Sequence, residues 1–152
     1  MASILLIDDT PSVLAALDYC LKSVGYEVLL AGDGRKGLQL AGEKSPDLIM
    51  LDLEMPLLNG VAVCRALKAD PLLKRIPVLM MTGQATQEAR RQALAAGAIV
   101  VMSKPFDLEV LEATVARCIA EGGGTPPARG LGMLGQGPPP SLNPSSTPAP
   151  VC

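Results

Sequence analysis

The sequence predicts an α/β protein in which a doubly wound, five-stranded parallel sheet carries five helices. Short apolar runs alternate with segments whose apolar residues recur at helical spacing, and this alternation is typical of successive βαβ units. Proline and glycine stand between the segments, where the chain must turn. At 152 residues the chain has the length of one domain with a single well-buried core.

Three strands and two helices are predicted in the first half of the chain. Thr10 and Pro11 supply an N-cap and a first-turn proline to a helix that ends at Gly25. Asp33 is the expected cap of a second helix over about residues 34–43, which Pro46 terminates. The three strands are predicted at residues 4–7, 27–31 and 48–51.

The second half repeats the pattern with two strands and three helices. Asn59 and Gly60 lead into a helix with apolar residues on one side. A helix over about residues 86–95 is short of large apolar side chains, so we expect it to be exposed and mobile. The last helix, from Asp107 to about Glu121, buries Leu111 and the residues aligned with it. The two strands are predicted at residues 78–81 and 99–102.

The composition changes abruptly after Glu121. Residues 122–152 contain 7 glycines and 8 prolines, with Arg129 as the one charged residue. Such a segment lacks the apolar surface to build a core, so it is predicted to be a flexible tail. The folded domain is therefore expected over residues 1–121, with no output domain after it. The tail could serve as a linker or as a partner-binding segment.

Charge and composition disfavour several classes of partner. The 13 basic and 15 acidic residues nearly balance, and one Phe, two Tyr and no Trp offer little for stacking on nucleic acid. No apolar stretch approaches the roughly 18 residues that a membrane span needs. Four cysteines lie far apart with no Cys-x-x-Cys pair, which predicts free thiols or small buried groups and a reducing, cytoplasmic location.

Polar residues follow four of the five apolar runs. Asp8 and Asp9 follow the first run, Asp52 the third, Thr82 the fourth and Lys104 the fifth. The carboxyl ends of parallel strands open onto one edge of the sheet, where such folds bind ligands. Three carboxylates that meet there need a cation to stay ionised. Oxygen ligands in a chain without histidine favour Mg²⁺ over zinc.

Residues 1 to about 121 resemble the response-regulator receiver domains of two-component signalling, in particular the single-domain, chemotaxis-type regulators. The resemblance implies a flavodoxin-like receiver fold and a phosphorylation-dependent switch, which is a signalling domain and not an enzyme beyond self-phosphorylation and autodephosphorylation. It rests on Asp8-Asp9, Asp52 with Met55-Pro56 and Asn59-Gly60, Thr82-Gly83, Ala96-Gly97-Ala98 and Lys104-Pro105-Phe106.

The resemblance also implies a role for each residue of the site. Asp52 would accept a phosphoryl group from a histidine kinase or a phosphotransfer protein. Phosphoryl transfer needs an in-line nucleophile and counter-charge, and the set provides both. The implied roles are Mg²⁺ binding by Asp8, Asp9, Asp52 and the backbone carbonyl of Glu54, contacts to the phosphoryl oxygens by Thr82 and Lys104, and a cis bond before Pro105.

Signalling to a partner is expected through the fourth helix, the fifth strand and the fifth helix. Gln87, Arg90 and Arg91 should be exposed on this face, which would bind a downstream protein or a second copy of the chain. The family has an aromatic residue on the fifth strand that rotates when the threonine moves. Val101 stands at that position, so the usual aromatic response is in doubt.

Glu54 and Gln84 lie two residues beyond Asp52 and Thr82, where family side chains border the path of the hydrolytic water. A carboxylate at Glu54 would repel hydroxide and could accept a hydrogen bond, so slower loss of the phosphoryl group is expected.

Two other functions remain open from the sequence. A haloacid-dehalogenase-like phosphohydrolase also combines a strand-end Asp, a Thr and a Lys with Mg²⁺, but it needs an Asp-x-Asp pair where this chain has Asp8-Asp9. A degenerate receiver that acts as a scaffold is disfavoured by the intact set of site residues.

Overall fold

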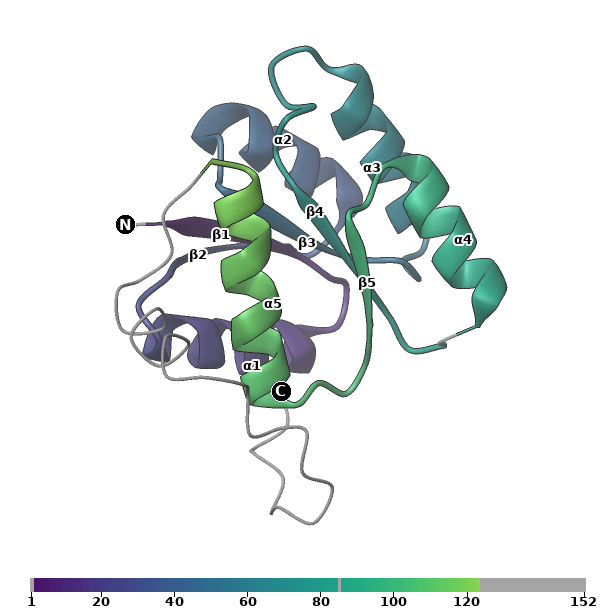
Figure 1. The fold of residues 1–152 in the computed structure, drawn as a ribbon. Helices are drawn as coiled ribbons and strands as arrows, with labels where there is room; N and C mark the ends of the chain where they lie inside the picture. The colour runs from purple at the N-terminus through teal and green to yellow at the C-terminus, as the bar shows by residue number, and fades with distance from the viewer. Residues whose placement is uncertain (1, 85, 124–152) are drawn as a thin grey trace.

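Five parallel strands form one sheet in the computed structural model, which describes residues 2–84 and 86–123 (Figure 1). The strand order is β2-β1-β3-β4-β5. This order and the alternation of strands with helices confirm the predicted fold class. The strands are β1 (Ser3–Ile7), β2 (Glu27–Ala31), β3 (Leu48–Asp52), β4 (Val78–Thr82) and β5 (Val100–Ser103).

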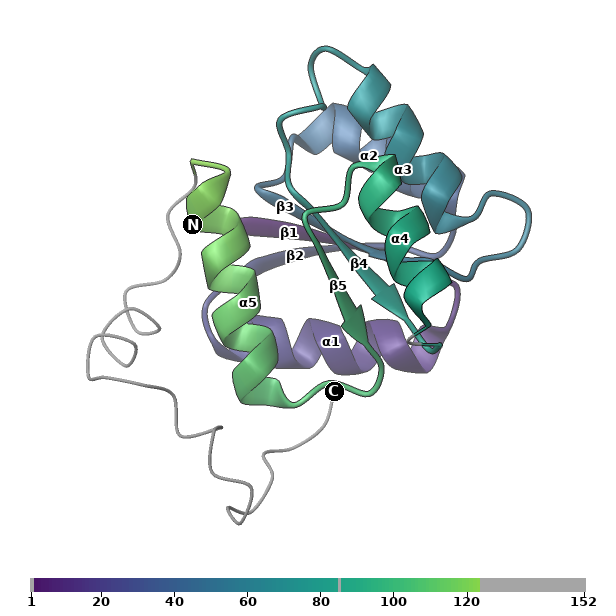
Figure 2. The same ribbon diagram turned by 45° about the vertical axis from the view of Figure 1, so that its right-hand side comes forward.

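Helices cover both faces of the sheet, as Figures 1 and 2 show. One face packs against α1 (Pro11–Ser23) and α5 (Leu108–Glu121). The other packs against α2 (Gly34–Lys44), α3 (Gly60–Ala69) and α4 (Gln87–Ala96). Each face holds its own apolar core, so β1, β3 and β4 bury nearly every side chain and their sequences are continuous apolar runs.

Capping side chains fix the starts of four helices. Asp33 accepts a hydrogen bond from the Lys36 N–H at 2.8 Å, and the equivalent bonds are made by Asn59, Thr86 and Asp107 at the starts of α3, α4 and α5. Thr10 occupies the N-cap of α1 without a side-chain capping bond. Its backbone N–H instead donates to Asp8 Oδ1 at 2.9 Å, which ties the loop after β1 to the edge of the sheet.

The end of β3 and the start of α3 approach each other closely at Gly60. A Cβ on this glycine would lie 2.4 Å from the backbone oxygen of Asp52, so a side chain does not fit. The Gly60 N–H also donates to the carbonyl of Leu53 at 3.1 Å. The loop that follows Asp52 is thereby held against the end of its own strand.

The cysteines differ from one another in state. Cys64 and Cys118 are free and buried, as predicted. Cys20 is disulfide-bonded, so the prediction of free thiols is wrong for this residue. Isolated cysteines without a spacing motif do not indicate which pairs the fold brings together.

Within residues 2–84 and 86–123, every helix falls short of the length and apolarity that a membrane crossing requires. The predicted tail lies outside the described residues apart from Gly122 and Gly123.

Candidate functional site

Carboxylates from two strands meet at the carboxyl edge of the sheet. Asp8 follows β1 directly, with Asp9 beside it, and Asp52 is the last residue of β3. Each of these three residues offers one oxygen, and the three oxygens lie within 4.8 Å of one another. Asp8 and Asp52 are buried, whereas Asp9 is exposed. The register of the parallel sheet, which pairs Ile7 with Leu51, accounts for this convergence.

Lys104 inserts its ammonium group between the two buried carboxylates. Its Nζ lies 2.9 Å from Asp8 Oδ2 and 3.3 Å from Asp52 Oδ1. The Lys104 N–H donates to the carbonyl of Thr82 at 2.8 Å, and the bond from Lys104 to Pro105 is cis. Burial alone would lower the pKa of Lys104, but its hydrogen bond to Asp8 and the charge of Asp52 outweigh this and raise it. The lysine therefore stays charged.

Asp52 keeps an unusually basic carboxylate despite the nearby lysine. Burial and the negative charge of Asp8 raise its pKa from 3.8 to about 6. The Lys104 ammonium and a hydrogen bond from the Glu54 N–H at 3.2 Å oppose the rise without cancelling it. Three carboxylates face one ammonium, so negative charge remains in excess.

The donor set fits a hard divalent cation. All the candidate ligands are oxygens, and the chain contains no histidine. A cation among Asp8, Asp9 and Asp52 would also neutralise the charge that raises the pKa of Asp52. The Glu54 N–H that bonds to Asp52 brings the backbone of Glu54 beside this carboxylate, while coordination by its carbonyl stays a prediction.

Thr82 ends β4 at the same edge, and its hydroxyl donates a hydrogen bond to the Glu54 carboxylate. The hydroxyl lies 2.5 Å from Glu54 Oε2, and the Gly83 N–H donates to Glu54 Oε1 at 2.9 Å. Thr82 Oγ1 also accepts a hydrogen bond from the Gln84 N–H at 3.0 Å. Both oxygens of the Glu54 carboxylate therefore bind the turn that leads out of β4.

The sequence model of the response regulator receiver domain family matches residues 4–116. The chain belongs to this family. Receiver domains are the phosphorylation-dependent switches of two-component systems, and the fold described above is that of such a domain. This result confirms the family and the signalling class that the motifs indicated.

Curated relatives of this receiver domain include longer proteins. The DNA-binding dual master transcriptional regulator RpaA of Synechocystis is 39% identical over 139 residues, which is 91% of this chain and 58% of RpaA. The alkaline phosphatase synthesis regulatory protein PhoP of Bacillus subtilis is 38% identical over 112 residues, 74% of this chain and 46% of PhoP. The chain thus spans about half the length of the curated relatives it matches.

Solved structures resemble this receiver domain over nearly their whole length. The chemotaxis protein CheY4 of Vibrio cholerae is 34% identical with a TM-score of 0.74, covering 78% of this chain and 98% of CheY4. The receiver domain of the sensor histidine kinase PA1611 from Pseudomonas aeruginosa is 31% identical with a TM-score of 0.74 and the same coverage. The latter contains a magnesium ion coordinated in its active-site cleft.

The residues expected on the partner face of the receiver domain lie on α4 and β5. Gln87, Arg90 and Arg91 are exposed on α4, and Arg91 is ion-paired with Glu88. Val101 is 7% exposed and packs in the core on the α3 and α4 side of the sheet.

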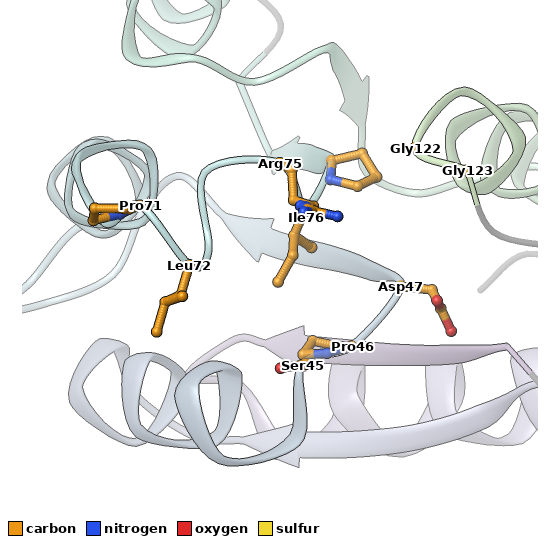
Figure 3. A pocket seen from close by; sticks show the side chains of 10 residues that line it. Ser45, Pro46, Asp47, Pro71, Leu72, Arg75, Ile76, Gly122 and Gly123 are labelled. Atoms are coloured by element: carbon orange, nitrogen blue, oxygen red, sulfur yellow. The ribbon is translucent and has the colours of Figure 1, made fainter.

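A pocket lies at the other edge of the sheet (Figure 3). It is lined by residues that precede β3 and β4, including Asp47 and Pro77, and by Gly122 after α5. The amino ends of the strands therefore form this pocket, and none of the residues predicted for the site lines it.

Sequence reasoning placed Glu54 beside the path of water but missed its bond to Thr82. The two residues are 28 positions apart on different strands and loops, so no local pattern could pair them. The sequence offered only a weak indication of this hydrogen bond. A carboxylate stands two residues after one strand, and a hydroxyl stands at the end of the adjacent strand.

Proposed function

We propose that Asp52 is the phosphoacceptor of this receiver domain. The observation that carries the proposal is the meeting of Asp52, Asp8 and Lys104 at the carboxyl edge of the sheet. In the proposed step, an Asp52 oxygen attacks the phosphorus of a phosphohistidine. A P–O bond forms as the P–N bond breaks, and the histidine nitrogen keeps the electron pair and takes up a proton. The product is an acyl phosphate on Asp52.

Each neighbouring group has a part in this step. Asp8, Asp9, Asp52 and the Glu54 carbonyl would hold Mg²⁺, which when bound supplies positive charge to the phosphoryl oxygens. Lys104, which is held inward by Asp8, provides a second positive charge beside Asp52. Thr82 provides a hydroxyl from the end of the adjacent strand. The protein thus positions charge and needs no acid or base of its own.

The proposed phosphoryl donor is a histidine kinase or a phosphotransfer protein. A cytoplasmic location of this chain would be compatible with either donor. A downstream protein, or a second copy of the chain, would bind the face that carries Gln87, Arg90 and Arg91. The name of RpaA states that it binds DNA. We do not propose DNA binding for this chain, because the match covers 58% of RpaA.

Intact-mass spectrometry after incubation with acetyl phosphate and Mg²⁺ tests the proposal. We expect the protein to gain about 80 Da, the mass of one phosphoryl group, and Asp52→Asn to gain nothing. Asp47→Asn is the matched control, because it changes the aspartate before the same strand, and it should retain the adduct. An adduct of equal yield in Asp52→Asn would refute the assignment.

The two alternative functions predict different results in the same assay. A phosphohydrolase would turn over small phosphate esters many times, whereas a receiver accumulates one phosphoryl group. A scaffold that has lost the chemistry would form no adduct in the wild-type protein. The intact set of Asp52, Thr82 and Lys104 supports the switch over the scaffold, and the match to the receiver family over residues 4–116 supports it over the phosphohydrolase.

A further inference from the structure

The side chain of Glu54 connects the loop after β3 to the end of β4. Its two oxygens accept bonds from the Thr82 hydroxyl and the Gly83 N–H, while its own backbone N–H donates to Asp52. One residue of the loop after β3 therefore binds the proposed nucleophile with its backbone and the end of β4 with its side chain. Glu54 lies at the surface, so the burial of an apolar group does not account for this placement.

The hydroxyl of Thr82 has one proton to donate. Its acceptors within reach are Glu54 Oε2 at 2.5 Å and the Gln84 carbonyl at 3.1 Å, and the shorter bond is to the charged group. A phosphoryl oxygen on Asp52 would need the same proton. Glu54 and the phosphoryl group therefore compete for Thr82.

We propose that Glu54 is a latch that holds Thr82 and Gly83 in the unphosphorylated state and releases them when Asp52 is phosphorylated. This inference rests on the proposed function of Asp52. The phosphoryl group adds negative charge near the Glu54 carboxylate, and like charges repel. Release frees Gly83, which lies three residues before Thr86, the residue that caps α4. Glu54 is a positioning residue in this scheme.

The latch offers a route to the partner face that needs no aromatic side chain on β5. Val101 is aliphatic and already packed in the core, so rotation of a large side chain at this position does not occur. The Glu54 latch instead acts on the backbone that enters α4, where Gln87, Arg90 and Arg91 are exposed. The signal would travel through the start of α4.

The inference is tested with Glu54→Ala, Glu54→Gln and the control Glu43→Gln, which removes the same charge from an exposed position on α2. In metal-free, unphosphorylated protein, Glu54→Ala should shift the NMR resonance of the Gly83 amide and speed its hydrogen exchange. Glu54→Gln, which keeps one acceptor oxygen, should have a smaller effect, and Glu43→Gln should have none. An unchanged Gly83 amide in Glu54→Ala would overturn the latch.

The second measurement is the affinity for beryllofluoride, a phosphoryl mimic, in the presence of Mg²⁺. Loss of a hydrogen bond to a charged group shifts an equilibrium by roughly tenfold, so Glu54→Ala should bind beryllofluoride about tenfold more tightly than the wild type. Equal or weaker binding by Glu54→Ala, beside normal wild-type binding, refutes the latch and leaves the function of Asp52 intact. Failure of the wild-type protein to bind in an Asp52-dependent way refutes the proposed function instead.

Discussion

The two edges of the sheet each hold an aspartate of the β3 segment and a lysine, but they use them differently. At the amino edge, Asp47 accepts a hydrogen bond from the Ser3 N–H at 2.8 Å. Lys68 donates there to the carbonyls of Lys74 and Ile76, at 3.0 and 2.8 Å. These two charges are therefore matched by backbone groups of the fold.

At the carboxyl edge, the charges face other charges. Lys104 contacts both Asp8 and Asp52, and Asp9 adds a third carboxylate to the same place. Charged side chains that hydrogen-bond to backbone groups hold loops in position, and folding alone satisfies them. The excess negative charge at the carboxyl edge is instead a cost in the folded protein that a cation can relieve. The difference separates the polar groups that serve the fold from those that serve the switch.

The largest expected effect comes from removing a lysine. Lys104→Met leaves Asp8 and Asp52 without their shared partner and should lower the free energy of unfolding by about 3 kcal/mol at pH 8 without metal. The cost should shrink toward pH 5, because Asp52, whose pKa is raised to about 6, then binds a proton in the folded state. Urea unfolding at both pH values checks this. Lys68→Met, which loses bonds to neutral carbonyls, should cost the same at pH 5 and pH 8.

Asp52→Asn should raise the free energy of unfolding, whereas Lys104→Met should lower it. The pKa of Asp52 is raised to about 6, so between about pH 4 and 6 the folded state binds more protons than the unfolded state, and stability falls as the pH rises. Above that interval the full cost is present. The variant should therefore gain at most about 3 kcal/mol at pH 8 in EDTA, and about half of that at pH 5. A destabilised Asp52→Asn protein at pH 8 would contradict this account of the carboxyl edge.

The convergence of polar residues at one edge was predictable from the sequence because it follows from geometry. Parallel strands put their carboxyl ends together, so residues that follow apolar runs must meet even when they are as far apart as Asp8 and Lys104. A local residue pattern identified the helix cap Asp33, whose hydrogen bond reaches only three residues along the chain.

Contacts between loops were not predictable in this way. The bond from Thr82 to Glu54 depends on how two loops fold over the edge, and sequence spacing does not encode that geometry. Thr10 has the residue type of a capping side chain, yet its capping bond is absent and its backbone N–H bonds to Asp8.

Asp47→Asn should destabilise the protein by a smaller amount. The Asn side chain can keep one acceptor oxygen for the Ser3 N–H, but it loses the charge that strengthens this bond. We expect a loss of up to about 2 kcal/mol that is equal with and without Mg²⁺. Urea unfolding in EDTA and in Mg²⁺ measures both values. A loss that appeared only without metal would mean that Asp47 is coupled to the carboxyl edge, and the two edges would not be independent.

Mg²⁺ should stabilise the protein through the carboxyl edge alone. At a free Mg²⁺ concentration ten times the dissociation constant, linkage predicts a gain of about 1.4 kcal/mol in the free energy of unfolding. At one fixed Mg²⁺ concentration the gain should be larger at pH 8 than at pH 5, because protons compete with the metal for Asp52, whose pKa is raised. Asp47→Asn should respond like the wild type. Asp52→Asn should respond weakly, because it lacks both a ligand and the repulsion that the metal relieves, and an undiminished response in this variant would place the metal elsewhere.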